Sequence, residues 1–226
     1  MNSTLEARPD LQGLPVVLLL ANRKVVVIGA GNIASRKIEG LINSGAKNIT
    51  VVAPLVSDEI REWEKQNLLK VREREMIDSD LDDAFYVCTA TEKNEVNSHV
   101  FDVCESNNII CNSADDPKNC SAILMSTVKQ GDITVAISSA GKSPALAKWL
   151  RQHVQSELGP EYQDLMKILS EEREAMRDAG FSSEDANWSA MFAAGVVDLV
   201  KEGKLEEARA VVRGIISQVT DVSVEK

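Results

Sequence analysis

The sequence predicts an α/β protein in which a parallel sheet comes first, followed by a small β-hairpin region and an all-helical C-terminal domain. Three observations predict this order. Short β-branched runs alternate with amphipathic segments, two apolar runs then flank a glycine turn, and the rest of the chain has helical periodicity. Alternation of this kind is typical of parallel strands whose connecting helices cover both faces of a sheet.

The expected parallel strands are short, apolar and rich in β-branched residues: 24–28, 49–52, 69–72, 85–88 and 109–111. The segments between them carry apolar residues at helical spacing: 33–44, 58–66 and 94–105. The apolar stretch 14–21 precedes the first strand. It is too short to span a bilayer and lacks the features of a signal peptide, so we expect it to pack in extended form beside the sheet.

The second half of the chain changes character. Runs 122–128 and 133–139 flank Gly131, which predicts a hairpin because glycine adopts the positive φ that such turns need. Both faces of this hairpin read as apolar, so we expect its strands to be covered. Expected helices follow at 144–158, 161–179, 187–202 and 205–219. The predicted parts are therefore residues 1–113, 114–143 and 144–226.

The most specific motif is GxGxxA, formed by Gly29, Gly31 and Ala34 between the first strand and the first helix. Gly29 permits the tight turn, Gly31 lets the backbone approach a pyrophosphate, and Ala34 lets helix and strand pack closely. The free N–H groups of the helix start favour phosphate. The motif predicts a dinucleotide-binding Rossmann domain, and the alternative is a glycine turn that binds nothing. The candidate cofactor-binding residues are Gly29, Gly31, Asn32, Ile33, Ala34, Ala53, Pro54, Thr89 and Ala90.

One feature of such domains is missing. An acidic residue is expected at the end of the second strand to bind the ribose hydroxyls, but Ala53 and Pro54 stand there, and Asp58 and Glu59 come later. Because no cationic residue directly follows Pro54 to hold a 2′-phosphate, we favour NAD over NADP.

Two polar loops suggest a second site. Residues 112–120 follow the fifth strand, at the edge where doubly wound folds place ligands. Residues 138–147 follow the hairpin, where Ser143 as N-cap and Pro144 at the first helical position predict a helix start beside Lys142. Such a start suits a carboxylate or phosphate. The alternative is ordinary loop chemistry, since Asp-Pro turns and Ser caps are common.

These motifs together resemble the precorrin-2 dehydrogenase / sirohydrochlorin ferrochelatase family, which includes the amino-terminal module of siroheme synthase. The resemblance rests on residues 29–37, 51–54, 112–117 and 137–147, and extends over about residues 14 to 158. It departs at Ala122 and Met125, where the family usually has an aromatic residue and a proline. No methyltransferase domain is recognised.

The resemblance implies an enzyme that oxidises precorrin-2 to sirohydrochlorin with NAD, in siroheme biosynthesis, and in some members also inserts Fe²⁺. It implies that Asp115 is the catalytic base and that Ser139 belongs to the substrate site. Lys142, Lys148 and Arg151 are candidates for contacts with substrate carboxylates, from their charge and position, although most such side chains are simply solvated. The family also implies a homodimer that exchanges its hairpins.

Composition limits the classes of binding partner and the cellular compartment that we expect for the protein. The formal net charge is −10, so nucleic acid and membrane surfaces are unfavourable partners. The four cysteines lie in or beside apolar runs without a CxxC pair, which predicts reduced, buried thiols in a cytoplasmic protein and no metal site.

Two other functions remain open from the residues. One is a non-catalytic module that senses NAD, although such modules usually keep the acidic residue after the second strand. The other is a dehydrogenase of a different small substrate, for which neither Tyr86 nor Tyr162 lies in a recognisable catalytic motif.

Overall fold

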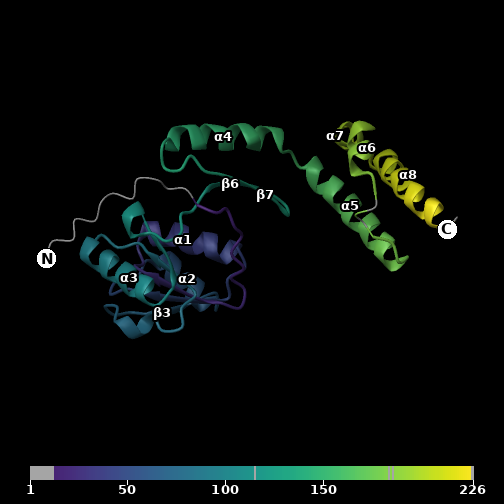
Figure 1. The fold of residues 1–226 in the computed structure, drawn as a ribbon. Coiled ribbons are helices and arrows are strands. Elements are labelled where there is room, and N and C mark those ends of the chain that lie inside the picture. The colour runs from purple at the N-terminus through teal and green to yellow at the C-terminus, as the bar shows by residue number, and fades with distance from the viewer. Residues whose placement is uncertain (1–12, 115, 183, 185, 225–226) are drawn as a thin grey trace. The chain divides into compact units, whose positions relative to one another are not determined.

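The chain divides into two compact units in the computed structural model (Figure 1), which describes residues 13–114, 116–182, 184 and 186–224. The first unit ends at Leu124 and the second begins at Met125. Each unit has its own hydrophobic core and is described by itself.

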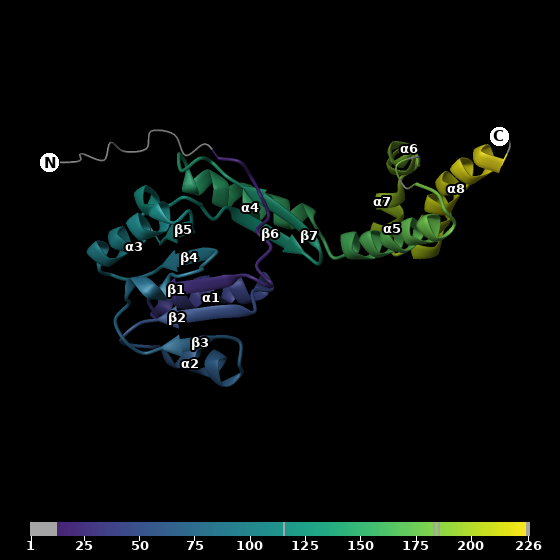
Figure 2. The ribbon, with the colours of Figure 1, turned by 60° about the horizontal axis from the view of Figure 1, so that its bottom comes forward.

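The first unit is built on a five-stranded parallel sheet with the strand order β3-β2-β1-β4-β5, which Figure 2 lets the reader follow. Its strands are β1 (Lys24–Ile28), β2 (Asn48–Val52), β3 (Lys70–Arg72), β4 (Tyr86–Thr89) and β5 (Ile110–Ser113). All neighbouring strands are parallel. The strand order reverses between β1 and β4, which is the point where doubly wound sheets bind their ligands.

Helices cover both faces of this sheet. On one face, α1 (Asn32–Asn43) and α2 (Asp58–Lys65) bury Ile38 and Ile60 against Val25 of β1. On the other face, α3 (Asn94–Ser106) and the 3₁₀ helix η1 (Asp78–Asp80) lie over Val26, with Val100 in the same core. Successive strand residues point to opposite faces, so a strand covered on both sides is apolar throughout.

The second unit begins with an antiparallel hairpin of β6 (Ser126–Gln130) and β7 (Ile133–Ile137), against which α4 (Pro144–Glu157) packs. A helical group follows, made of α5 (Glu161–Asp178), α6 (Trp188–Ala193), α7 (Val196–Lys201) and α8 (Leu205–Val224). Its core includes the buried side chains of Met191, Val196 and Val212. The buried carboxylate of Glu172 accepts hydrogen bonds from Arg209 and Arg213, which joins α5 to α8.

The predicted fold class is confirmed, but several details differ. The helix expected at 187–202 is two helices, because Gly195 has a φ of 77° and interrupts the helical backbone. The strand expected from residue 122 begins only at Ser126. Within the stretch 14–21, Leu20 is buried in the sheet core whereas Leu14 and Leu19 are exposed, so only its end packs as expected.

The hairpin is not apolar on both faces. Its residues alternate along each strand, and one face carries Val128 opposite Val135, which are the more buried positions. The other face is exposed and carries Thr127 opposite Ala136 and Lys129 opposite Thr134. The error arose because threonine and alanine are compatible with either environment.

No helix among the described residues is long and apolar enough to cross a membrane.

Candidate functional site

The glycine turn after β1 is shaped by a close approach of two chain segments. Gly29 has a φ of 107°, and a Cβ atom on it would lie 2.4 Å from the carbonyl oxygen of Ala90. The N–H of Ala90 donates to the carbonyl oxygen of Ile28 at 2.8 Å, which holds the loop after β4 against the turn. Only glycine fits this position, as the motif predicts.

The fold places no such restriction on Gly31. Its φ is −92°, which any residue adopts, and a Cβ atom on it would meet nothing within 4 Å. The space beside it is therefore open at the first residues of α1, where Asn32 and Ile33 are exposed. The first N–H groups of a helix have no partner within the helix, and Ala34 is fully buried against the sheet. The open space and the unpaired N–H groups at this turn fit a pyrophosphate, as the GxGxxA motif predicts.

The end of β2 carries no carboxylate. Ala53 is buried, Pro54 is exposed, and Asp58 and Glu59 lie in the first turn of α2. The N–H of Ala53 donates to the carbonyl oxygen of Arg72 at 3.2 Å, so an arginine on β3 lies directly beside this strand end. The sequence did not point to this arginine, because a cation that could bind a 2′-phosphate was expected only among the residues that follow Pro54.

The candidate residues after β4 also lie at the carboxyl edge of the sheet. The hydroxyl of Thr89 is buried and donates to the hydroxyl of Ser113 at 2.8 Å, which links the ends of β4 and β5. The N–H of Ala114 donates to the carbonyl oxygen of Thr89 at 2.8 Å. The proposed cofactor residues therefore gather at the ends of β1, β2 and β4, as expected for a dinucleotide at this edge.

The end of β5 contains a contact that sequence reasoning did not single out. The ammonium group of Lys37, on α1, donates to the Oδ1 atom of Asn112 at 2.8 Å, and the Nδ2 atom of Asn112 donates to the carbonyl oxygen of Ala122 at 2.9 Å. This contact brings a partly buried cation to the last residues of β5. Asp115, the predicted base, lies outside the described residues.

Asp116 shapes the turn that follows. Its carboxylate accepts a hydrogen bond from the side chain of Asn119 at 2.6 Å, and its carbonyl oxygen accepts one from the N–H of Asn119. It precedes the short 3₁₀ helix η2 (Pro117–Asn119). These two hydrogen bonds are typical of an aspartate that forms a turn.

The four cysteines are buried and form no disulfide bond. Burial raises the pKa of Cys88 to about 11, so its thiol is protonated at neutral pH. Among the described residues, no three His, Cys, Asp or Glu side chains are grouped so that they could hold a metal ion.

The candidate substrate residues of the second unit lie around the start of α4. The hydroxyl of Ser143 accepts a hydrogen bond from the N–H of Leu146, so the predicted cap is present. The hydroxyl of Ser139 accepts one from the N–H of Ser143 at 3.2 Å. The remaining candidates are cations. Lys142 and Lys148 are exposed, and Arg151 is half-buried.

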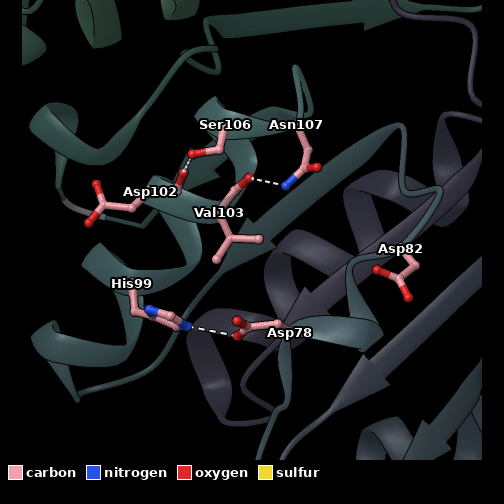
Figure 3. Close-up of a pocket in the computed structure, with 7 residues that line it drawn as sticks. All are labelled: Asp78, Asp82, His99, Asp102, Val103, Ser106 and Asn107. Atoms are coloured by element: carbon pink, nitrogen blue, oxygen red, sulfur yellow. Dashed lines mark hydrogen bonds and ion pairs between the residues drawn. The ribbon is translucent and has the colours of Figure 1, made fainter.

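A separate hollow of about 340 Å³ lies on the α3 side of the first unit (Figure 3). It is lined by Asp78, Asp82, Asp102 and His99, among others, and the Nε2 atom of His99 lies 2.7 Å from a carboxylate oxygen of Asp78. Lys24, at the start of β1, donates to the backbone carbonyl of Asp82. Asp82 therefore lies near the amino edge of the sheet, whereas the glycine turn lies at the carboxyl edge. Of the predicted site residues that the structure describes, none lines this hollow.

Comparison with known proteins indicates the same kind of nucleotide-binding domain as the fold and the glycine turn. Residues 16–126 match a family model described as NAD(P)-binding, and residues 130–157 match one described as the central part of a sirohaem biosynthesis protein. The chain is 31% identical over 200 residues to a siroheme synthase of Pseudoalteromonas translucida, which is 88% of this chain and 42% of that protein. A siroheme synthase 2 of Cronobacter sakazakii is 36% identical over 143 residues, 63% of this chain and 31% of that protein. The chain thus spans about two fifths or less of these curated relatives.

A solved structure of SirC, a precorrin-2 dehydrogenase, superposes with a TM-score of 0.70 and 28% sequence identity. The match covers 92% of this chain and 100% of that one. Fold and glycine turn together define an NAD(P)-binding Rossmann protein. Within that class, the chain belongs to the family of the siroheme synthase amino-terminal modules and precorrin-2 dehydrogenases.

Proposed function

We propose that this chain is a precorrin-2 dehydrogenase, an oxidoreductase that uses NAD⁺ to convert precorrin-2 to sirohydrochlorin. The observation that carries the proposal is the match to SirC, because it extends over both units and over the whole of that chain. The siroheme synthases are matched over less than half of their length, so they support the same step less directly.

The residues of the first unit supply the binding of the cofactor. When bound, NAD⁺ would supply the hydride acceptor for the oxidation of precorrin-2. Gly31 would leave room for the pyrophosphate, and the N–H groups at the start of α1 would donate to it. The oxidation also releases a proton, and a carboxylate is a suitable acceptor at neutral pH. We assign that role to Asp115, which follows β5 closely in sequence.

The second unit supplies candidates for the substrate. Precorrin-2 carries eight carboxylates, as the family resemblance implies, and these require cations or N–H donors. We propose that Ser139, Lys142, Lys148 and Arg151 provide them, since Lys142 directly precedes α4 and the other two cations lie on its first half, in a chain whose net charge is −10.

Three further parts of the proposal rest on the family. The active form is a homodimer, whose hairpins β6–β7 take part in the contact. The resemblance implies Fe²⁺ insertion into sirohydrochlorin for some members of the family, and a separate assay decides whether this chain has that activity. The protein works in the cytoplasm, a reducing compartment that suits its four cysteines, which form no disulfide bond.

The deciding experiment adds precorrin-2 and NAD⁺ to the purified chain and follows the absorbance of sirohydrochlorin. Product formation that requires NAD⁺ supports the proposal. NAD⁺ binding without turnover of precorrin-2 would instead favour a sensing module or a dehydrogenase of another substrate. Iron insertion is tested separately, by adding Fe²⁺ to sirohydrochlorin without NAD⁺.

A further inference from the structure

We propose that Arg72 and Arg74 form a site for the 2′-phosphate of an adenine dinucleotide, so that the cofactor pocket accepts NADP⁺ in addition to NAD⁺. The inference rests on the proposed function in that it places a nicotinamide cofactor at the carboxyl edge of the sheet. It extends that function by naming residues that bind the adenosine end.

Arg72 lies where the ribose is expected. It ends β3 and pairs in parallel register with Val52, the last residue of β2. The next residue, Ala53, stands where Rossmann domains that select NAD carry an acidic residue, and its N–H donates to the carbonyl oxygen of Arg72. A carboxylate at that position would repel a 2′-phosphate. Here it is replaced by a methyl group, with a guanidinium-bearing residue on the adjacent strand.

Both arginines are fixed in place by one buried carboxylate. The side chain of Asp80 is 0% exposed and accepts bonds from Arg72 and from both terminal nitrogens of Arg74, the latter at 2.6 and 2.7 Å. The N–H of Ile77 donates to the same carboxylate at 3.0 Å. The guanidinium groups are therefore held in one arrangement before any ligand arrives, which lowers the entropic cost of binding.

The two arginines retain both exposure and charge. Their side chains are 45% and 41% exposed, whereas the Asp80 side chain is not exposed. Of the neighbouring acids, Glu73 is paired with Arg61 and Glu75 with Lys93. Two guanidinium groups against one carboxylate leave a net positive charge. Arginine matches phosphate oxygens with paired N–H donors, so this pair suits a phosphate monoester.

The test measures binding and needs no tetrapyrrole. Adenosine 2′,5′-bisphosphate and 5′-AMP differ only in the 2′-phosphate, and both are titrated into the full chain by calorimetry, with NADP⁺ and NAD⁺ alongside. The variant is Arg72→Gln, which leaves Asp80 paired with Arg74. The control is Lys47→Gln, which removes one positive charge from an exposed position directly before β2, at the amino edge of the sheet. Thermal unfolding verifies that each variant is folded.

We expect the unmodified chain to bind the bisphosphate at least as tightly as AMP. Arg72→Gln should weaken binding of the bisphosphate and NADP⁺ by about tenfold or more and leave AMP and NAD⁺ unchanged, because a hydrogen bond to a charged group is lost. Arg72→Lys keeps the positive charge but loses the paired N–H donors of the guanidinium group. It should therefore weaken binding of the bisphosphate and NADP⁺ less than Arg72→Gln does. Lys47→Gln should change none of the four affinities.

Three results would overturn the inference: a chain that binds AMP but rejects the bisphosphate, an Arg72→Gln variant that keeps the affinity for the bisphosphate, or an equal loss for all four ligands. The first two leave the dehydrogenase proposal intact. Conversely, a 2′-phosphate effect that depends on Arg72 in a chain that does not oxidise precorrin-2 supports the inference and contradicts the proposed function.

Discussion

At the scale of single residues, the two glycines of the nucleotide turn have different roles that the sequence motif does not separate. Gly29 is needed by the fold, since a side chain there would collide with the backbone at Ala90. Gly31 leaves the fold unconstrained, since a side chain there would meet open space. This difference makes Gly31 the better position for testing the binding of the cofactor.

Gly31→Asp is expected to abolish NAD⁺ binding without unfolding the protein. The carboxylate would occupy the space of the pyrophosphate, and like charges in contact cost several kcal/mol, so affinity should fall by about a hundredfold or more. Calorimetric titration measures the loss, and circular dichroism verifies the fold. NAD⁺ affinity that stays unchanged in this variant would contradict the placement of the cofactor.

Asp115→Asn is expected to slow precorrin-2 oxidation by about 10²- to 10⁴-fold, which is typical for the loss of a general base. NAD⁺ binding should persist, because Asp115 has no assigned contact with the cofactor. The measurement is the rate of sirohydrochlorin formation. Asp116→Asn is the matched comparison, since the Asp116 side chain accepts a turn hydrogen bond from Asn119. A slow Asp116→Asn variant beside a fully active Asp115→Asn variant would show that the wrong carboxylate was chosen.

At the scale of secondary-structure elements, Asp80 ties η1 to β3 and to the residues after it. Hydrogen bonds from Arg74, and further bonds from Ile77 and Arg72, hold the pKa of Asp80 well below its usual value despite burial. A carboxyl group with a lowered pKa in the folded state stabilises the fold at pH values above its unfolded pKa. That contribution is lost as the pH falls toward the folded value.

Asp80→Asn should therefore lower the stability at pH 7 and reduce its decline below about pH 4, where the unfolded carboxyl takes up its proton. Removal of one partner from a buried ion pair costs about 3–5 kcal/mol. We expect the lower end of that range or less, because both arginines are partly exposed and screened by solvent. Urea unfolding at pH 7 and pH 3.5 measures the difference. A variant whose stability declines with pH as steeply as the parent would exclude this role.

The central strand of the sheet was predictable because β1 is buried on both faces and is apolar from Val25 to Ile28. The hairpin was harder to interpret. Its exposed face consists of threonine, lysine and alanine side chains, and two of these residue types read as compatible with burial. The break at Gly195 was missed because glycine within a helical pattern is often tolerated, and only the backbone shows its positive φ.

At the scale of the whole molecule, the first unit's site was predictable where its residues are contiguous in sequence. The glycine turn is one such segment. The contact of Lys37 with Asn112 and the approach of Arg72 to Ala53 were not predictable, since each joins residues that only the strand order and register bring together. Asp115 was proposed from the resemblance and stays a prediction.

The quaternary state gives a prediction at this scale. We expect a homodimer at micromolar concentration, measured by light scattering at about twice the chain mass of 24.7 kDa. The exposed face of the hairpin offers a position at which to test whether the hairpin takes part in the dimer contact. Thr134→Glu places a carboxylate opposite Lys129 on that face and should weaken a contact made there, whereas Thr91→Ser on the first unit should not. A monomeric parent chain would contradict the dimer.

The edges of the sheet have a consequence for the behaviour of the protein at high concentration. An unpaired edge strand can recruit a strand from another molecule and start aggregation. On β5, the carbonyl oxygen of Cys111 already accepts the N–H groups of Ser121 and Ala122, and its N–H donates to the hydroxyl of Ser121. On the opposite edge, β3 is only three residues long and carries Lys70 and Arg72. Both edges are thus poor templates for intermolecular β-pairing, which protects a sheet composed largely of valine and isoleucine from forming fibres.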